Sequence, residues 1–154
     1  MSHWYAIVDG AADPRLYDLI IGCRDYACLY SGDYDEDVRA TLPYMVRMRN
    51  GEKFSEIWSA HESGKFWGIL CKTDMELTSF RRHLRHFTTA QLPGGEVVMF
   101  RFWDPRVFSV YAEEGTLEEV GSFFKGIETV LCDLGSEGRK NYDWENSLKA
   151  TKQR

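Results

Sequence analysis

The stretch FWGILCKTDMELTSFRRHLRHF, residues 66–87, decides the fold. Its first part, Phe66 to Cys71, is almost continuously apolar, which is typical of a strand covered on both faces. Four large apolar residues then recur at helical spacing and predict a helix with one apolar face. They are Leu77, Phe80, Leu84 and Phe87. Thr73 and Glu76 precede this helix at the spacing of a capping box, so the stretch predicts a buried strand followed by a capped amphipathic helix.

Strand and helix patterns alternate on both sides of this stretch. Apolar runs predict further strands at 4–8, 26–30, 44–48 and 96–103, and helices are expected near 14–21, 54–63, 105–114 and 116–131. The run from Val97 to Phe100 is apolar at every position. It predicts a central strand, paired with residues 88–92 through the turn at Pro93-Gly94-Gly95. Together these patterns predict an α/β (α+β) fold, with a mixed sheet of about five strands and helices packed on it in a single lobe.

The predicted elements all lie within residues 1–134, which we expect to form one domain. Residues 135–154 are polar, and their few large apolar side chains include Trp144 and Leu148. Segments of this composition often remain mobile. We therefore expect residues 135–154 to form a mobile or loosely docked C-terminal tail.

Asp-Pro pairs occur at residues 13–14 and 104–105, and both are typical of helix starts. The aspartate accepts a hydrogen bond from a free backbone N–H, and proline fits the first helical position because it has no N–H to satisfy. We expect a structural role of this kind for Asp104 and Pro105. Structural roles are also expected for Asp9, which ends the first strand, and for the capping pair Thr73 and Glu76.

The composition excludes several function classes. The net charge of −5 argues against nucleic-acid binding, which requires a basic surface. No apolar run approaches the ~20 residues that span a bilayer. The first ten residues lack a basic segment followed by an apolar one, so we expect no signal peptide, no membrane partner and a cytoplasmic location. The cysteines form no Cys-x-x-Cys pair and are expected to be reduced, buried thiols. They are Cys23, Cys28, Cys71 and Cys132.

Motifs for catalysis, cofactors and metals are absent from the sequence. It contains no glycine-rich phosphate loop and no Gly-x-Ser-x-Gly motif. His83 and His86 lie three residues apart but have no third ligand nearby, so no metal site is expected. We therefore expect a non-enzymatic protein without a cofactor. One alternative stays open: a small enzyme whose Cys71, His61 and Asp104 meet only in space.

Two basic groups are candidates for protein binding. Arginine makes planar, multi-donor contacts, so Arg81, Arg82 and Arg85 on the predicted helix could dock an acidic partner segment. The alternative is an ordinary solvated helix face. A second candidate, a binding edge where strand meets helix, consists of Arg101, Trp103 and Arg106. The alternative there is structural, with Asp104 as the cap and an arginine paired to a carboxylate.

The segment FRFWDPRV, residues 100–107, resembles the signature of the type VI secretion effector adaptors, the Tap-type chaperone family. Other pieces resemble the family in the same order: YAIVDGA at 5–11, CLYSG at 28–32, LPYMV at 42–46, WGIL at 67–70, residues 77–85, and FFKGI at 123–127. The resemblance covers about residues 4–130. It departs from the family in two ways. The proline often found near residue 127 is missing, and the chain matches a short single-lobe form without the second, C-terminal lobe of many members.

The resemblance implies a cytoplasmic, non-catalytic adaptor. Such proteins bind a cognate secreted effector, keep it soluble and assist its attachment to a VgrG spike protein. A homodimer would enlarge the surface of a single lobe, and a standard interface buries ~1,600 Å². An immunity-type inhibitor, which neutralises a toxin rather than delivering it, remains an alternative.

Overall fold

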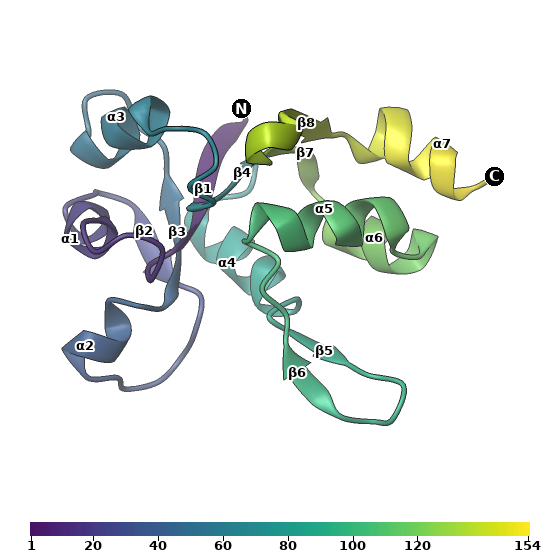
Figure 1. Ribbon diagram of the computed structural model, residues 1–154, viewed down its shortest axis with the longest axis horizontal. Helices are drawn as coiled ribbons and strands as arrows, with labels where there is room; N and C mark the ends of the chain where they lie inside the picture. Colours follow the sequence, from purple (N-terminus) through teal and green to yellow (C-terminus); the bar gives the residue numbers. More distant parts are fainter.

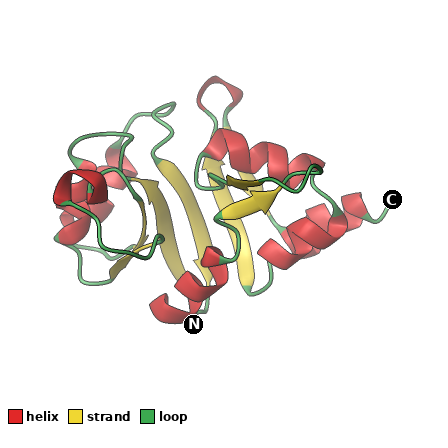
Figure 2. Cartoon of the chain, turned by 90° about the horizontal axis from the view of Figure 1, so that it is seen from below, coloured by secondary structure: helices red, strands yellow, loops and turns green.

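The computed structural model describes residues 1–154 and contains a large sheet with helices packed against it (Figures 1 and 2). Six strands form this sheet in the order β2-β3-β1-β4-β7-β8. Their bounds are β1 (His3–Asp9), β2 (Tyr26–Cys28), β3 (Pro43–Arg47), β4 (Gly68–Thr73), β7 (Ile127–Asp133) and β8 (Arg139–Tyr142). The helices are α1 (Leu16–Ile21), α2 (Glu36–Arg39), α3 (Lys53–Ala60), α4 (Leu77–Arg85), α5 (Pro105–Glu114), α6 (Leu117–Phe123) and α7 (Lys149–Lys152). None of the helices is both long and apolar enough to cross a membrane.

The α+β class expected from the sequence is confirmed, but the pairing of the strands differs from the expectation. Every neighbouring pair in the six-stranded sheet is antiparallel, whereas a mixed sheet of about five strands was expected. The difference arises because strands that run in the same direction are not neighbours: β3 lies between β1 and β2, and β1 lies between β3 and β4. A strand–helix–strand succession in sequence therefore does not by itself identify a parallel pair.

Alternation along the strands builds a separate core on each face of the sheet. Tyr5 and Ile7 of β1 enter a cluster of 22 buried residues that includes the apolar faces of α4, α5 and α6. Ala6 and Val8 enter a cluster of 12 buried residues that includes α1 and α3. Each large apolar side chain buried in this way contributes about 1.5–3 kcal/mol. The two cores fix α4 on one face of the sheet and α3 on the other.

A glycine in the middle of the buried run 66–71 is required by the close packing of β4 on β1. A Cβ atom added to Gly68 would lie 1.9 Å from the carbonyl oxygen of Ile7. Gly68 also pairs with Val8 in the sheet. The strand therefore needs a residue without a side chain at this position.

The hairpin predicted around Pro93-Gly94-Gly95 is confirmed, but its expected central position is wrong. β5 (Thr89–Gln91) and β6 (Val97–Met99) form a sheet of their own. Figure 1 shows this hairpin extending away from the rest of the molecule. The centre of the main sheet is instead occupied by β1 and β4. The two strands of the hairpin are joined by a local turn in which Gly95 N–H bonds to Leu92 O at 2.8 Å.

The C-terminal part differs most from the sequence prediction. The last helix was expected to continue to Leu131, but α6 ends at Phe123 and Gly126, with φ at 83°, turns the chain into β7. The expectation of a loosely docked tail is also wrong. β8 pairs with β7, and three apolar side chains of the tail belong to the larger core. They are Tyr142, Trp144 and Leu148.

Candidate functional site

The first turn of α4 is held in place differently from the predicted capping box. Thr73 ends β4, and its hydroxyl donates to Gly126 O at 2.6 Å and accepts from Met75 N–H at 3.1 Å. Glu76 is itself the residue before the helix, and its side chain caps no backbone group. The capping box is therefore wrong, because the chain uses Thr73 to close the turn between strand and helix.

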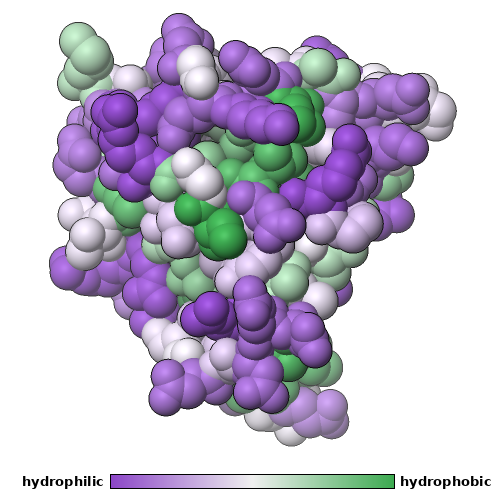
Figure 3. All heavy atoms as spheres, turned by 90° about the vertical axis from the view of Figure 1, so that its left-hand side faces the viewer, coloured by the Kyte–Doolittle hydropathy of each residue, from purple (hydrophilic) through white to green (hydrophobic).

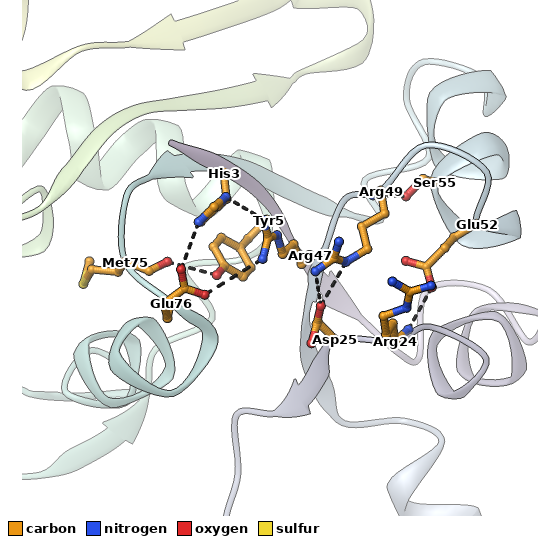
Figure 4. Close-up of polar contacts among 10 residues, drawn as sticks. All are labelled: His3, Tyr5, Arg24, Asp25, Arg47, Arg49, Glu52, Ser55, Met75 and Glu76. Atoms are coloured by element: carbon orange, nitrogen blue, oxygen red, sulfur yellow. Dashed lines mark hydrogen bonds and ion pairs between the residues drawn. The ribbon is translucent and has the colours of Figure 1, made fainter. Parts of the chain in front are cut away.

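Glu76 instead joins a polar cluster that ties α4 to the sheet (Figure 4). Its carboxylate lies 3.3 Å from His3 Nε2 and 3.9 Å from Arg47 Nη1. Arg47 also lies 2.8 Å from His3 Nδ1. Because a guanidinium only donates, Nδ1 accepts this bond and the ring proton is on Nε2, facing Glu76. With the bond from Tyr5 OH to Met75 O at 3.0 Å, the start of α4 is fixed to β1 and β3.

The same view shows a second group that ties β2 to α3 (Figure 4). Arg49 donates twice to one oxygen of Asp25, at 2.9 and 2.5 Å. Glu52, directly before α3, accepts from Arg24 N–H at 2.8 Å. Arg49 and Asp25 thus satisfy one another, whereas the second oxygen of Glu52, Oε1, is buried without a hydrogen-bond partner. The contacts of Asp25 and Glu52 give this end of the sheet a structural role.

The structure divides the three arginines of α4 into two kinds. Arg81 is half-buried, and it donates to Cys28 O at 2.7 Å and to Ser31 Oγ at 3.5 Å. Arg82 and Arg85 are exposed, and neither lies within 4.0 Å of a carboxylate. All three line a hollow of about 410 Å³ together with Thr78 and His86. Arg81 is thus a tether between α4 and β2, whereas Arg82 and Arg85 leave uncompensated positive charge at the surface.

The other predicted binding group is not brought together. Trp103 is only 2% exposed and packs against Phe102 and Tyr30 in the larger core. Arg101 is exposed and bonds to Asp9 Oδ2 at 2.5 Å. The structural alternative therefore describes residues 100–107 better than a binding edge. Asp9 also accepts from Ala11 N–H at 2.9 Å, which closes the turn after β1.

Asp104 caps α5 as the sequence predicted. Its Oδ1 accepts from Arg106 N–H at 2.9 Å, and the Arg106 side chain bonds to both carboxylate oxygens at 3.0 and 2.9 Å. Burial raises the pKa of Asp104, but these hydrogen bonds outweigh it, so the pKa lies below its ordinary value. Pro105 occupies the first turn of the helix.

The Asp-Pro-Arg sequence occurs twice, and both copies adopt the same local geometry. In residues 13–15, Asp13 Oδ1 accepts from Arg15 N–H at 2.8 Å and from its side chain at 3.0 Å. The two arginines then lie against neighbouring rings: Arg15 is 5.7 Å from the ring centre of Trp67, and Arg106 is 4.3 Å from that of Phe66. Sequence reasoning noted the repeated Asp-Pro but missed the shared arginine, which was the available signal for this pair of cation–π contacts.

A hollow of about 370 Å³ lies next to these rings, between the end of α3 and strands β4, β7 and β8. Leu70 and Leu131 line it from the sheet, and His61 stacks on Trp67 at 4.1 Å. The carboxylate of Asp133 is already bonded to Ser63 at 2.6 Å and to Gly135 N–H at 3.0 Å. Burial acts to raise the pKa of Asp133, yet these bonds lower it overall. The hollow therefore combines aromatic and apolar side chains with polar ones, and its carboxylate, Asp133, already has hydrogen-bond partners.

The proposed trio of Cys71, His61 and Asp104 is not assembled. Cys71 is fully buried in the larger core, whereas His61 stacks on Trp67, which belongs to the smaller core on the opposite face of the sheet. Burial also raises the pKa of Cys71 well above its ordinary value and that of Cys132 to about 12. Thiols of this kind are poor nucleophiles.

His83 and His86 lie three residues apart in the sequence, and no metal site was expected at them. His83 bonds to Phe123 O at 2.7 Å, and burial lowers its pKa. No group of three or more His, Cys, Asp or Glu side chains is arranged to hold a metal ion. His83 therefore joins α4 to the end of α6.

The side formed by α1, α2 and α3 is mostly polar, with some hydrophobic atoms near its centre (Figure 3). Ile21 of α1 and Val38 of α2 are among the exposed large hydrophobic residues of the chain. Exposed apolar side chains that occur singly are normal on folded domains. This side therefore adds no candidate to the arginines of α4.

The model of one protein family, the domain of unknown function DUF4123, matches residues 4–122. The chain belongs to the DUF4123 family. No curated protein and no solved structure matches it. The part that matches the DUF4123 model runs from β1 into α6, so it includes both Asp-Pro-Arg copies, the arginines of α4 and the β5–β6 hairpin.

Proposed function

We propose that this chain is a cytoplasmic adaptor that binds a type VI secretion effector and assists its loading onto a VgrG spike protein. The observation that carries the proposal is membership of the DUF4123 family over residues 4–122. The segment FRFWDPRV, which resembles the signature of the effector adaptors, lies inside that match. An adaptor acts by binding and does not turn over a substrate.

The geometry supports a binding role through features that a partner can reach. Arg82 and Arg85 carry uncompensated positive charge on a helix that Glu76 and Arg81 hold rigidly against the sheet. A fixed helix presents its side chains at little entropic cost on binding. The nucleophile and base considered for an enzyme lie on opposite faces of the sheet, which favours binding over catalysis as the activity of this chain.

Deleting the gene in its native strain tests the proposal. We expect the cognate effector to be made at its normal level but to disappear from the medium, as measured by immunoblotting cells and medium separately. A plasmid copy should restore secretion, and so should a copy with His61→Ala, because no catalysis is involved. Normal secretion combined with self-poisoning of the cells would instead identify an immunity-type inhibitor and contradict the proposal.

A further inference from the structure

The β5–β6 hairpin exposes an apolar strand to water. Val97, Val98 and Met99 are 68%, 38% and 54% exposed, and both strands pair only with each other. A two-stranded sheet is marginal in water unless a third strand or a packed face supports it. β6 therefore has the apolar composition of a central strand, although it lies at the edge of a two-stranded sheet.

The free edge of β6 can be defined from the pattern of hydrogen bonds. Phe100 N–H bonds to Thr88 O at 2.9 Å, and Leu92 N–H bonds to Glu96 O at 2.7 Å. Because bonded and non-bonded pairs alternate in an antiparallel ladder, Ala90 and Val98 form the bonded pair between them. The N–H and C=O groups of Val97 and Met99 therefore point outward, away from β5, where another strand can pair with them.

The base of this edge adjoins the arginines of α4. Thr88 Oγ1 donates to Arg85 O at 3.0 Å, and the same residue accepts from Phe100 N–H through its carbonyl. Met99 is thus the end of β6 nearest to the last turn of α4. This turn contains Arg82 and Arg85, and His86 follows it directly. A strand added along β6 would have one end beside these positive side chains.

We infer that the free edge of β6 binds an extended segment of a partner protein as a third strand, with acidic side chains beside Met99 that face Arg82 and Arg85. The inference rests on the proposed function, because it names the surface with which the adaptor holds its effector. The recognition mode is strand addition, in which backbone bonds give affinity and side chains give specificity. A second copy paired antiparallel along the same edge would bring a single acidic residue, Glu96, to this end. Two arginines are available there, so charge favours a partner segment with several acidic side chains.

The probe is a short synthetic peptide that alternates threonine and valine and carries glutamates at its N-terminal end. In an antiparallel pairing this end lies beside Met99. We expect it to slow amide hydrogen exchange at Val97 and Met99, and a matching peptide with lysines in place of glutamates to bind about tenfold more weakly or less. Val97→Pro removes one outward N–H without breaking the β5–β6 ladder, so it should abolish binding. Gln91→Pro makes the same change on the opposite edge and should leave binding intact.

Charge reversal supplies the second arm of the test. Arg82→Glu combined with Arg85→Glu should reverse the preference, so that the lysine peptide binds better than the glutamate peptide. Equal binding by wild type, the Val97→Pro variant and the charge-reversed variant would overturn the inference, as would unchanged exchange at Val97 and Met99. A wild-type dimer in light scattering that Val97→Pro converts to monomer would assign the edge to a second copy and also overturn it.

The outcome is separable from that of the proposed function. If secretion is lost on gene deletion but a Val97→Pro copy restores it fully, the adaptor role stands and the assigned surface is wrong. If secretion does not depend on the gene, the adaptor role fails whatever the peptides do.

Discussion

Two runs of three apolar residues differ in burial in this molecule. Ile69-Leu70-Cys71 in β4 lies between β1 and β7, and both Ile69 and Cys71 are fully buried. Val97-Val98-Met99 in β6 has only β5 beside it and is exposed along its length. The two runs look alike in sequence. Burial is therefore decided by whether other strands and helices are available to cover a run, and hydrophobicity alone does not say so.

The largest expected contrast is in core packing. Ile69→Ala should lower the free energy of unfolding by about 2–5 kcal/mol, because it leaves a cavity in the larger core. Val98→Ala removes atoms already in contact with water and should change it by no more than about 0.5 kcal/mol. Urea denaturation followed by circular dichroism measures both. Similar losses for the two variants would mean that the hairpin is packed against the body.

Glycines in the two regions give the next contrast. Gly68→Ala places a methyl group 1.9 Å from Ile7 O, so β4 must move and stability should fall by about 1–3 kcal/mol. Gly94→Ala, in the hairpin turn, meets only the flexible Glu96 side chain at 3.7 Å. We expect almost no change there. Thermal melts of both variants check the prediction, and a stable Gly68→Ala protein would contradict the close packing of β4 on β1.

The cap of α5, which follows the hairpin in the chain, can be compared with the Asp-Pro-Arg copy before α1. Asp104→Ala should cost about 1 kcal/mol. Asp13→Ala removes the same Asp-Pro-Arg arrangement from the shorter α1, whose capping position is Arg15, and should cost less. Melting temperatures of the two variants at neutral pH compare the copies. An equal loss from both would show that the Asp-Pro-Arg contacts, rather than capping, set the effect.

The Asp104 effect should also depend on pH in a defined direction. Its pKa in the folded protein is lowered, so the carboxylate stabilises the fold above its unfolded pKa of about 3.9. This contribution disappears as the pH falls through the folded value. The difference in melting temperature between wild type and Asp104→Ala should therefore shrink below about pH 4. A difference that persists unchanged at lower pH would rule out the charged form as its source.

Much of the fold could be predicted because local signals were sufficient for it. The apolar runs located β1, β3 and β4, and the spacing of Phe80 and Leu84 located α4. Sequence patterns failed where partners distant in the chain decide the outcome. Ile127 and Val130 fit a helical stripe as well as a strand, and only pairing with β4 makes them β7. The docking of Trp144 depends on the space beside Phe124, which no local pattern reports.

The candidate site shows the same division between local and distant signals. The cap at Asp104 was predictable because its partners lie two residues away. Arg81 resembled Arg82 and Arg85 in the sequence, and only the approach of β2 to α4 separates it from them. Trp103 was a candidate for a binding edge, yet the neighbouring Phe102 and Tyr30 enclose it. Side chains whose role depends on a third element are the ones that sequence reasoning misassigned.

The smallest predicted effect compares two glutamates: Glu76, which lies between β4 and α4, and Glu96, which precedes β6. Glu76→Gln should reduce stability by no more than about 1 kcal/mol, because the Glu76 side chain that pairs with His3 and Arg47 is 74% exposed. The loss should diminish at high salt, since an exposed ion pair is screened.

Glu96→Gln is the matched control at the hairpin. Glu96 takes part in no ion pair, so its replacement should be neutral at any salt concentration. Denaturation at low and high salt makes the comparison. A loss for Glu76→Gln that is independent of salt would show that shape or hydrogen bonding, and not charge, holds α4 to the sheet.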